Sequence, residues 1–252
     1  MRELLVIGVG AGDPDHVTMQ AVQALHTVDV FFVLDKGPAT ADLTEARRQI
    51  LERFARPERH REVLVADPPR DRAATDYPDA VRLWRDARAE LLERVLRAEL
   101  ADGGRGGFLV WGDPSLYDGT IRVLDTIVAR GVLPLEYQVI PGISSVQALA
   151  ARHRVTLNRV AGAVHVTTGR RLADGLPEGV DDLVVMLDAR FAAKAYRDQQ
   201  IDIYWGAYLG TPDEVLISGR LGEVVDRIER TRNELRERKG WIMDTYLIRR
   251  NP

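Results

Sequence analysis

Two turns of the sequence carry the same Gly-Asp-Pro triplet, and each follows an apolar run of strand length. The first turn is GVGAGDP (8–14) and the second is WGDPSLY (111–117). Glycines in such turns let the backbone bend tightly and approach a ligand closely. A single triplet predicts only a turn, because Asp readily caps the helix that follows it. Two triplets at strand ends favour a shared ligand site.

The first turn differs from the dinucleotide-binding pattern GxGxxG. In that pattern the third glycine comes three residues after the second. Here Gly12 comes two residues after Gly10, and Asp13 follows. An acidic residue at this position would also repel a pyrophosphate at the helix N-terminus. The turn therefore disfavours a nicotinamide or flavin oxidoreductase.

Four continuous apolar runs predict the strands that position these turns, at 4–9, 28–34, 108–111 and 135–140. Helical spacing at 18–25 makes the opening a βαβ unit, and continuous apolarity is typical of parallel strands covered on both faces. The turns GVGAGDP, WGDPSLY and PGISS then all leave the carboxyl ends of strands. Ligands bind open α/β sheets at that edge. We therefore expect an α/β fold with its site there.

The rest of the chain predicts covering helices and a second lobe. Amphipathic helices are expected at 41–54 and 79–100, with an irregular proline-rich excursion at 56–78 that overhangs the site. The later segments predict strands at 163–168, 182–187, 201–208, 214–219 and 241–248, and a helix at 221–238. This pattern predicts a mixed sheet. We divide the chain into lobes 1–154 and 155–252.

The composition narrows the possible partners. A net charge of −3 disfavours nucleic-acid binding, which leaves a basic face on a protein. No apolar run approaches the roughly 20 residues of a membrane span, and the N-terminus shows no cleavable leader, so we expect a cytoplasmic protein. The chain has no cysteine, and its five histidines lack metal-binding spacing. We expect no metal.

Three segments together resemble the tetrapyrrole methylase family: GVGAGDPDHVT, WGDPSLYDG and IPGISSVQALAA. The resemblance extends over most of the chain. It implies two α/β lobes with S-adenosylmethionine bound in the cleft between them. The segments VFFVLDKG and GWIMDTYLIRR look like the branch of the family that methylates precorrin-5 at ring carbon 1 and releases acetate.

The resemblance also implies which residues contact the cofactor. In the first lobe these are Gly8, Gly10, Ala11 and Gly12 in the first turn, and Trp111, Gly112, Asp113, Leu116 and Tyr117 in the second. Later in the chain they are Ser144 and Ser145, and then Leu187, Ala207, Trp241 and Ile242 around the adenosine. Many relatives have proline where this chain has Ala11, so the first turn departs from the family pattern.

The implied reaction places different demands on its two parts. A sulfonium methyl is already electrophilic, so its transfer needs alignment and no protein nucleophile. Acetate release needs a general base or acid, for which Asp35, His16 and Tyr117 are the candidates. Each has a structural alternative: Asp35 as a turn cap, His16 as a surface residue and Tyr117 as packing on the cofactor.

Several arginines and a lysine are candidates to bind the carboxylates of a tetrapyrrole through charge-assisted hydrogen bonds. They are Lys36, Arg59, Arg61, Arg70 and Arg72. The resemblance also implies a homodimer. Four alternatives stay open: a methylase of the same fold acting on another precorrin, one acting on ribosomal RNA or a protein histidine, a non-catalytic tetrapyrrole carrier, and a nucleotide-dependent oxidoreductase.

Overall fold

The computed structural model describes residues 1–35, 41–68 and 77–251. By their internal contacts these residues form two compact units. The first unit comprises Met1–Gly10 and Pro14–Ile143, and the second comprises Ala11–Asp13 and Ser144–Pro252. The predicted boundary after residue 154 lies further along the chain than this division, which places α5 (Ser145–His153) in the second unit.

The first unit is built on a five-stranded parallel sheet with strand order β3-β2-β4-β1-β5. Its strands are β1 (Arg2–Gly8), β2 (Val30–Asp35), β3 (Arg61–Ala66), β4 (Arg105–Val110) and β5 (Leu135–Ile140). Its helices are η1 (Pro14–His16), α1 (Met19–Leu25), α2 (Ala41–Phe54), α3 (Tyr77–Glu99) and α4 (Thr120–Arg130). The prediction of a parallel α/β sheet is confirmed.

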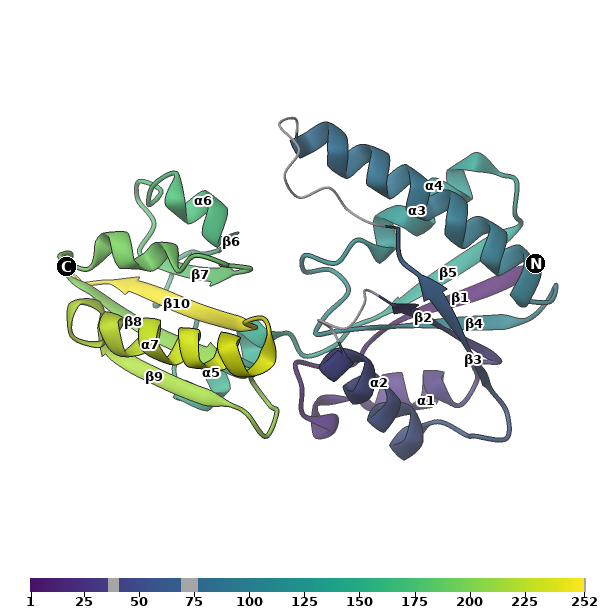
Figure 1. Ribbon diagram of the computed structural model, residues 1–252, viewed down its shortest axis with the longest axis horizontal. Coiled ribbons are helices and arrows are strands. Elements are labelled where there is room, and N and C mark those ends of the chain that lie inside the picture. The colour runs from purple at the N-terminus through teal and green to yellow at the C-terminus, as the bar shows by residue number, and fades with distance from the viewer. Residues whose placement is uncertain (36–40, 69–76, 252) are drawn as a thin grey trace. The chain divides into compact units, whose positions relative to one another are not determined.

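Helices cover both faces of this sheet, as Figure 1 shows, with α1 and α2 on one side and α3 and α4 on the other. Alternate residues of β1 divide between the two layers, since Leu4 and Val6 pack in the α3 and α4 cluster and Leu5 and Ile7 in the α1 and α2 cluster. All four are at most 4% exposed. This burial on both faces explains the continuous apolar runs.

The strand β3 corrects the prediction that 56–78 is irregular throughout. It pairs with β2 at the edge of the sheet, and its burial alternates weakly, with Leu64 66% exposed and Val65 3% exposed. An edge strand with one mostly solvated face carries little of the apolar signal by which strands are recognised. The charged residues and prolines that flank β3 weaken the remaining apolar pattern further.

The second unit contains a mixed five-stranded sheet with strand order β6-β7-β10-β8-β9. Its strands are β6 (Val164–Thr168), β7 (Asp182–Met186), β8 (Ile201–Ala207), β9 (Val215–Arg220) and β10 (Asp244–Arg250). Besides α5 its helices are α6 (Gly169–Ala173), η3 (Ala192–Tyr196) and α7 (Leu221–Lys239). Only β6 and β7 pair in parallel; the other neighbours are antiparallel. The predicted mixed sheet is confirmed.

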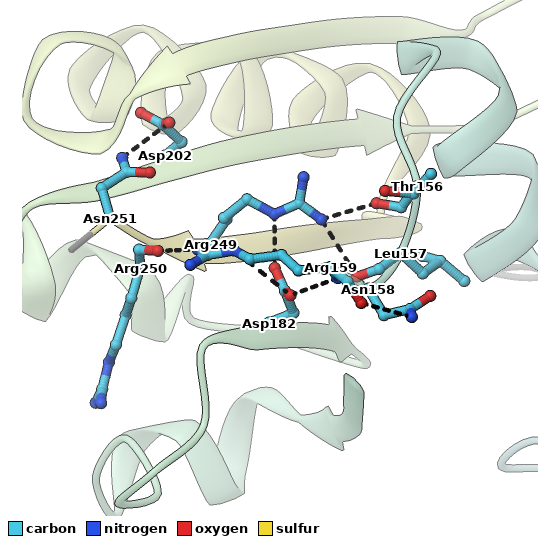
Figure 2. A network of polar contacts seen from close by, with 9 residues as sticks. All are labelled: Thr156, Leu157, Asn158, Arg159, Asp182, Asp202, Arg249, Arg250 and Asn251. Carbon is cyan, nitrogen blue, oxygen red and sulfur yellow. Dashed lines mark hydrogen bonds and ion pairs between the residues drawn. The ribbon is translucent and has the colours of Figure 1, made fainter. Parts of the chain in front are cut away.

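The segment after α5 is anchored to this sheet by Asp182, which is 1% exposed (Figure 2). Its carboxylate accepts a hydrogen bond of 2.6 Å from Arg249 Nε and one of 3.3 Å from the backbone N–H of Arg159. Arg249 also donates to the carbonyl oxygen of Thr156 at 2.8 Å. One buried carboxylate thus ties the connection at 154–163 to β7 and β10.

Candidate functional site

Three strand-end turns of the first unit come together at backbone contact distance. Gly10 and Gly112 form a β-bridge, with N–H to carbonyl distances of 3.3 and 2.8 Å. A Cβ atom added to Gly142 would lie 2.1 Å from the carbonyl oxygen of Gly112, and one added to Gly8 would lie 2.5 Å from the backbone nitrogen of Gly142. Only glycine permits this packing. The structure therefore brings the turns after β1, β4 and β5 into one cluster, as the sequence predicted.

Asp113 holds two of these turns in place. One carboxylate oxygen accepts the backbone N–H of Gly142 at 2.9 Å, and the other accepts the N–H of Ser115 at 2.8 Å and its hydroxyl. Burial raises the pKa of Asp113, but the hydrogen bonds from Ser115 and Gly142 outweigh it and hold that pKa below its usual range. Asp113 does not cap the helix that follows, because α4 begins at Thr120, whose N–H donates to Asp118 at 2.7 Å.

Tyr117 ends the same turn in an unfavourable backbone conformation. Its φ is +52° and its side chain is 47% exposed, while Trp111 and Leu116 are partly buried. Partial burial raises the pKa of Tyr117. A bulky residue in the left-handed region is uncommon, and such residues gather at ligand sites.

His16 packs directly against the first turn. A Cβ atom added to Gly10, whose φ is +86°, would lie 2.6 Å from the Cβ of His16. Within the described part of the chain, the buried Nδ1 of His16 has no hydrogen-bond partner. The backbone of Asp35 ends β2 at the same edge of the sheet. The side chain of Asp35 lies outside the described residues, as do Lys36, Arg70 and Arg72.

The structure does not bring Arg59 and Arg61 to this edge. Arg61 begins β3 opposite Val30, the first residue of the parallel β2, so it lies at the amino end of the sheet. It pairs there with Glu99 at 2.8 Å, and Arg59 precedes it in the same turn. The substrate role predicted for these two arginines gains no support.

In the second unit, the hydroxyls of the predicted serine pair are engaged. Ser144 is the N-cap of α5 in a capping box with Gln147, and its oxygen accepts the N–H of Val146 at 3.1 Å. The hydroxyl of Ser145 accepts a hydrogen bond of 2.9 Å from Thr245. Of the first turn, the buried Ala11 and the partly buried Gly12 also belong to this unit.

Leu187, Ala207 and Ile242 lie at the same end of the second sheet. β7 and β8 both run antiparallel to β10, so both end beside the start of β10, with Thr245 opposite Met186 and Gly206. Leu187 is 65% exposed with a φ of +53°, whereas Ala207 is fully buried. Trp241 and Ile242 pack partly buried against the core, and the carbonyl of Trp241 accepts the hydroxyl of Tyr208 at 2.6 Å.

A buried polar network, which the sequence analysis did not find, holds the residue after Leu187. The carboxylate of Asp188 accepts N–H groups of Arg190 and Ala192 at 3.1 and 2.7 Å and the hydroxyl of Tyr246 at 2.5 Å. The guanidinium of Arg232 donates to the carbonyl oxygen of Asp188 at 2.5 Å. Asp188 thereby fixes the backbone from which Leu187 projects.

Arg232 extends this network to Asp244, and the side chains of both are 2% exposed. Asp244 also accepts the indole N–H of Trp205 at 2.8 Å. Burial raises the pKa of Asp244 to about 6, although the charge of Arg232 acts in the opposite direction. Burial and the neighbouring Asp188 raise the pKa of Tyr246 well above its ordinary value. The network is a structural support beneath the exposed turn.

Residues 3–225 match the sequence model of the tetrapyrrole (corrin/porphyrin) methylases. The chain belongs to this family. The methylases of this family depend on S-adenosylmethionine, and the chain is accordingly a methyltransferase. This membership argues against the oxidoreductase alternative.

Two relatives of this methylase match it along almost its whole length. It is 48% identical over 250 residues to a precorrin-6A synthase [deacetylating] from Sinorhizobium sp, covering 99% of this chain and 96% of the relative. The crystal structure of a putative cobalamin synthesis related protein (CobF) from Corynebacterium diphtheriae is 36% identical with a TM-score of 0.84, covering 99% and 98% of the two chains.

A more distant structure shares the fold of this methylase. The crystal structure of uroporphyrin-III C-methyl transferase from Thermus thermophilus complexed with S-adenyl homocysteine has a TM-score of 0.59 at 18% identity, covering 98% of this chain and 96% of that one. Among the described residues of the methylase, no helix is long and apolar enough to cross a membrane.

Proposed function

We propose that this chain methylates precorrin-5 at C-1 with S-adenosylmethionine and releases acetate, which gives precorrin-6A. The observation that carries the proposal is the 48% identity to a precorrin-6A synthase [deacetylating] over 99% of this chain. An identity of this size, spread over both units, supports the same chemistry more strongly than a shared fold does.

The glycine cluster of the first unit fits the methionine portion of the cofactor. Its turns pack closely, since Gly10 and Gly112 hydrogen-bond to each other and a Cβ atom added to Gly8 or Gly10 would clash with Gly142 or His16. Tyr117 adds an exposed ring held in a left-handed backbone conformation. We assign Trp111, Gly112, Leu116 and Tyr117 to this contact.

In the second unit, the exposed and left-handed Leu187 fits an apolar contact with the adenosine portion. Ala207 and Ile242 lie at the same edge of that sheet. Ser144 caps α5 and Ser145 accepts a hydrogen bond from Thr245 of β10, so the role of both serines is to position the backbone. Asp113 has the same kind of role in the first unit.

Bound S-adenosylmethionine supplies an electrophilic sulfonium methyl group. The chain needs to hold the macrocycle carbon in line with that methyl group and to exclude water, which the backbone cluster does without a nucleophilic side chain. In acetate release, a water oxygen adds to the acetyl carbonyl, the carbon–carbon bond breaks with its electron pair left on the macrocycle, and a protein base takes the water proton.

Asp35 and His16 are the proposed groups for that proton. Asp35 ends β2 at the carboxyl edge of the sheet, and His16 holds an Nδ1 without a hydrogen-bond partner among the described residues beside Gly10. Tyr117 is exposed in the same turn cluster and is the third candidate. The tetrapyrrole substrate, the cytoplasmic location and the homodimer all stay predictions.

The test is incubation of purified protein with precorrin-5 and methyl-labelled S-adenosylmethionine under anaerobic conditions. Mass spectrometry reads the label in the macrocycle and the acetate in solution. We expect both. Label without acetate would indicate a methylase acting elsewhere on the macrocycle, and neither signal from a protein that binds S-adenosylhomocysteine would leave a carrier.

A further inference from the structure

A small cavity of about 30 Å³ lies in the first unit beneath the carboxyl ends of β2 and β4. Apolar residues of these strands, Phe32–Leu34 and Phe108–Val110, line it together with Arg47, Arg88, Asp118 and Thr120. The cavity adjoins the proposed site by chain connectivity, because Leu34 precedes Asp35 and Asp118 follows Tyr117.

Arg47 of α2 lines this cavity, and most of its guanidinium has no hydrogen-bond partner among the residues that the structure describes. Its Nε donates to the carbonyl oxygen of Leu109 at 3.1 Å, and this is its only hydrogen bond within the described part of the chain. No carboxylate of the described residues lies within ion-pair distance of it. Burial lowers the pKa of Arg47, and the more distant charge of Asp118 opposes that shift. Arg47 is partly buried, and a partly desolvated cation is stabilised when an anion joins it.

Arg88, which also lines the cavity, is buried beside a carboxylate. Its Nε lies 2.9 Å from Asp67, and the two side chains are 5% and 7% exposed. Its guanidinium also stacks over Trp84 at 5.0 Å. Asp118 is likewise engaged, by the N–H of Thr120. Among the described residues Arg47, unlike Arg88, has no carboxylate partner, so its terminal nitrogens can bind one from a ligand.

The size of the cavity fits a small group such as one carboxylate. A buried water needs roughly 10–15 Å³ by the same measure, so about two waters fit. Two water sites correspond to the two oxygens of one carboxylate. The two terminal nitrogens of a guanidinium bind a carboxylate through parallel hydrogen bonds.

We propose that Arg47 forms a subsite for one side-chain carboxylate of the tetrapyrrole. This inference rests on the proposed function, because it assumes a tetrapyrrole substrate. Arg47 takes the carboxylate-binding role that the sequence analysis gave to Arg59 and Arg61. Fixing one peripheral carboxylate beside β2 and β4 restricts the rotation of the macrocycle and thereby determines which of its carbons meets the methyl group.

The test compares Arg47→Gln with Arg48→Gln, the neighbouring arginine on the same helix. Arg48 is an ideal control because its side chain is 51% exposed and pairs with Glu45 and Glu52 at the surface. The readouts are the KM for precorrin-5 and the Kd for uroporphyrin III, a tetrapyrrole polycarboxylate, from quenching of its fluorescence. The Kd for S-adenosylhomocysteine and the circular dichroism spectrum are measured in parallel.

We expect Arg47→Gln to raise the KM and the Kd for the tetrapyrroles by about 10- to 100-fold, the loss of one charge-assisted pair. Arg48→Gln should change neither by more than about twofold, because exposed pairs contribute little. Arg47→Lys keeps the charge without the fork and should fall between wild type and Arg47→Gln. S-adenosylhomocysteine affinity should stay unchanged in all three.

Unchanged tetrapyrrole affinity in Arg47→Gln overturns the subsite, and so does a loss confined to S-adenosylhomocysteine, which would assign the arginine to the methionine carboxylate. The subsite and the proposed function fail separately. If uroporphyrin III binding depends on Arg47 but the protein does not turn over precorrin-5, only the proposed reaction is wrong. If the protein turns over precorrin-5 and Arg47→Gln does so equally well, only the subsite is wrong.

Discussion

Tyr117 in the first unit and Leu187 in the second are supported in opposite ways, although their backbones are alike. Both follow a strand, both are exposed, and their φ angles are +52° and +53°. The turn of Tyr117 rests on glycine-to-glycine backbone contact and on one carboxylate, that of Asp113. The turn of Leu187 rests on a network of side chains that are almost fully buried.

The difference shows two ways to hold an exposed turn rigidly. Backbone contact needs no desolvated charge, but it tolerates no added atom. A buried charge network tolerates changes of shape better, yet removal of one partner leaves an uncompensated charge in the interior. Different substitutions and different pH ranges should therefore destabilise the two turns.

Gly142→Ala should have the largest effect. Its Cβ would lie 2.1 Å from the carbonyl oxygen of Gly112 and 2.8 Å from the backbone of Gly8, and neither can move without shifting a strand end. We expect a loss of about 5 kcal/mol in the free energy of unfolding, or failure to fold. Urea denaturation measures it.

Gly119→Ala is the matched control for Gly142→Ala. The nearest neighbour of its added Cβ is the Nη1 of Arg88 at 3.8 Å, and the φ of Gly119 is −98°. Its cost should stay below about 1 kcal/mol, the range of an N-cap exchange. Equal costs for the two variants would refute backbone contact as the support of the Tyr117 turn.

Arg232→Met should be the next largest change. It leaves Asp244 buried without its cation and the carbonyl of Asp188 without its donor. We expect a loss of about 3–4 kcal/mol, of which the double variant Arg232→Met/Asp244→Asn recovers part. Unfolding free energies from a double-mutant cycle measure the coupling, and additive losses would mean that the pair does not act as a unit.

The two supports should respond to pH with opposite slopes. The folded-state pKa of Asp113 is lowered, so its stabilisation is complete above the ordinary aspartate pKa and is lost as the pH falls below about 4. The folded-state pKa of Asp244 is raised to about 6, so the stability contributed by its protonated form is complete below about pH 4 and is lost as the pH rises through about 6.

Urea denaturation from pH 3 to pH 7 of wild type, Asp113→Asn and Asp244→Asn checks these slopes. As the pH falls below about 4, the free energy of unfolding should drop more for wild type than for Asp113→Asn. As the pH rises to about 6, it should drop more for wild type than for Asp244→Asn. Parallel curves for all three proteins would contradict the assigned supports.

Leu187→Gly should have the smallest effect on stability and a clear one on binding. Glycine relieves the left-handed strain, so the free energy of unfolding should rise by about 0.5–1 kcal/mol. Loss of the apolar contact should weaken S-adenosylhomocysteine about 10-fold by isothermal titration. Leu64→Gly, at an exposed position of β3 with ordinary backbone, should lower stability and leave this affinity unchanged.

Much of the first unit could be predicted from sequence, because two-sided burial and glycine turns leave local signals. The turns at GVGAGDP and WGDPSLY converge as expected. The capping box at Ser144 was also readable, since Gln147 follows it by three positions, and it would have identified that hydroxyl as structural.

The charge network and the Arg47 cavity leave no such signal. Asp188 meets Tyr246 across 58 positions of the chain, and Trp205 meets Asp244 across 39. Helical periodicity places Arg47 on α2 beside Arg48, but only the tertiary fold makes Arg47 partly buried and leaves Arg48 exposed. Long-range partners decide the role of such residues.

Methyl transfer coupled to acetate release has a defined stoichiometry, which one experiment can measure. A single reaction with precorrin-5, methyl-labelled S-adenosylmethionine and ¹⁸O-labelled water reads both products by mass spectrometry. We expect one acetate per transferred methyl group, with one ¹⁸O atom in each acetate. Methylated macrocycle with its acetyl group retained, or no transfer at all, would contradict it.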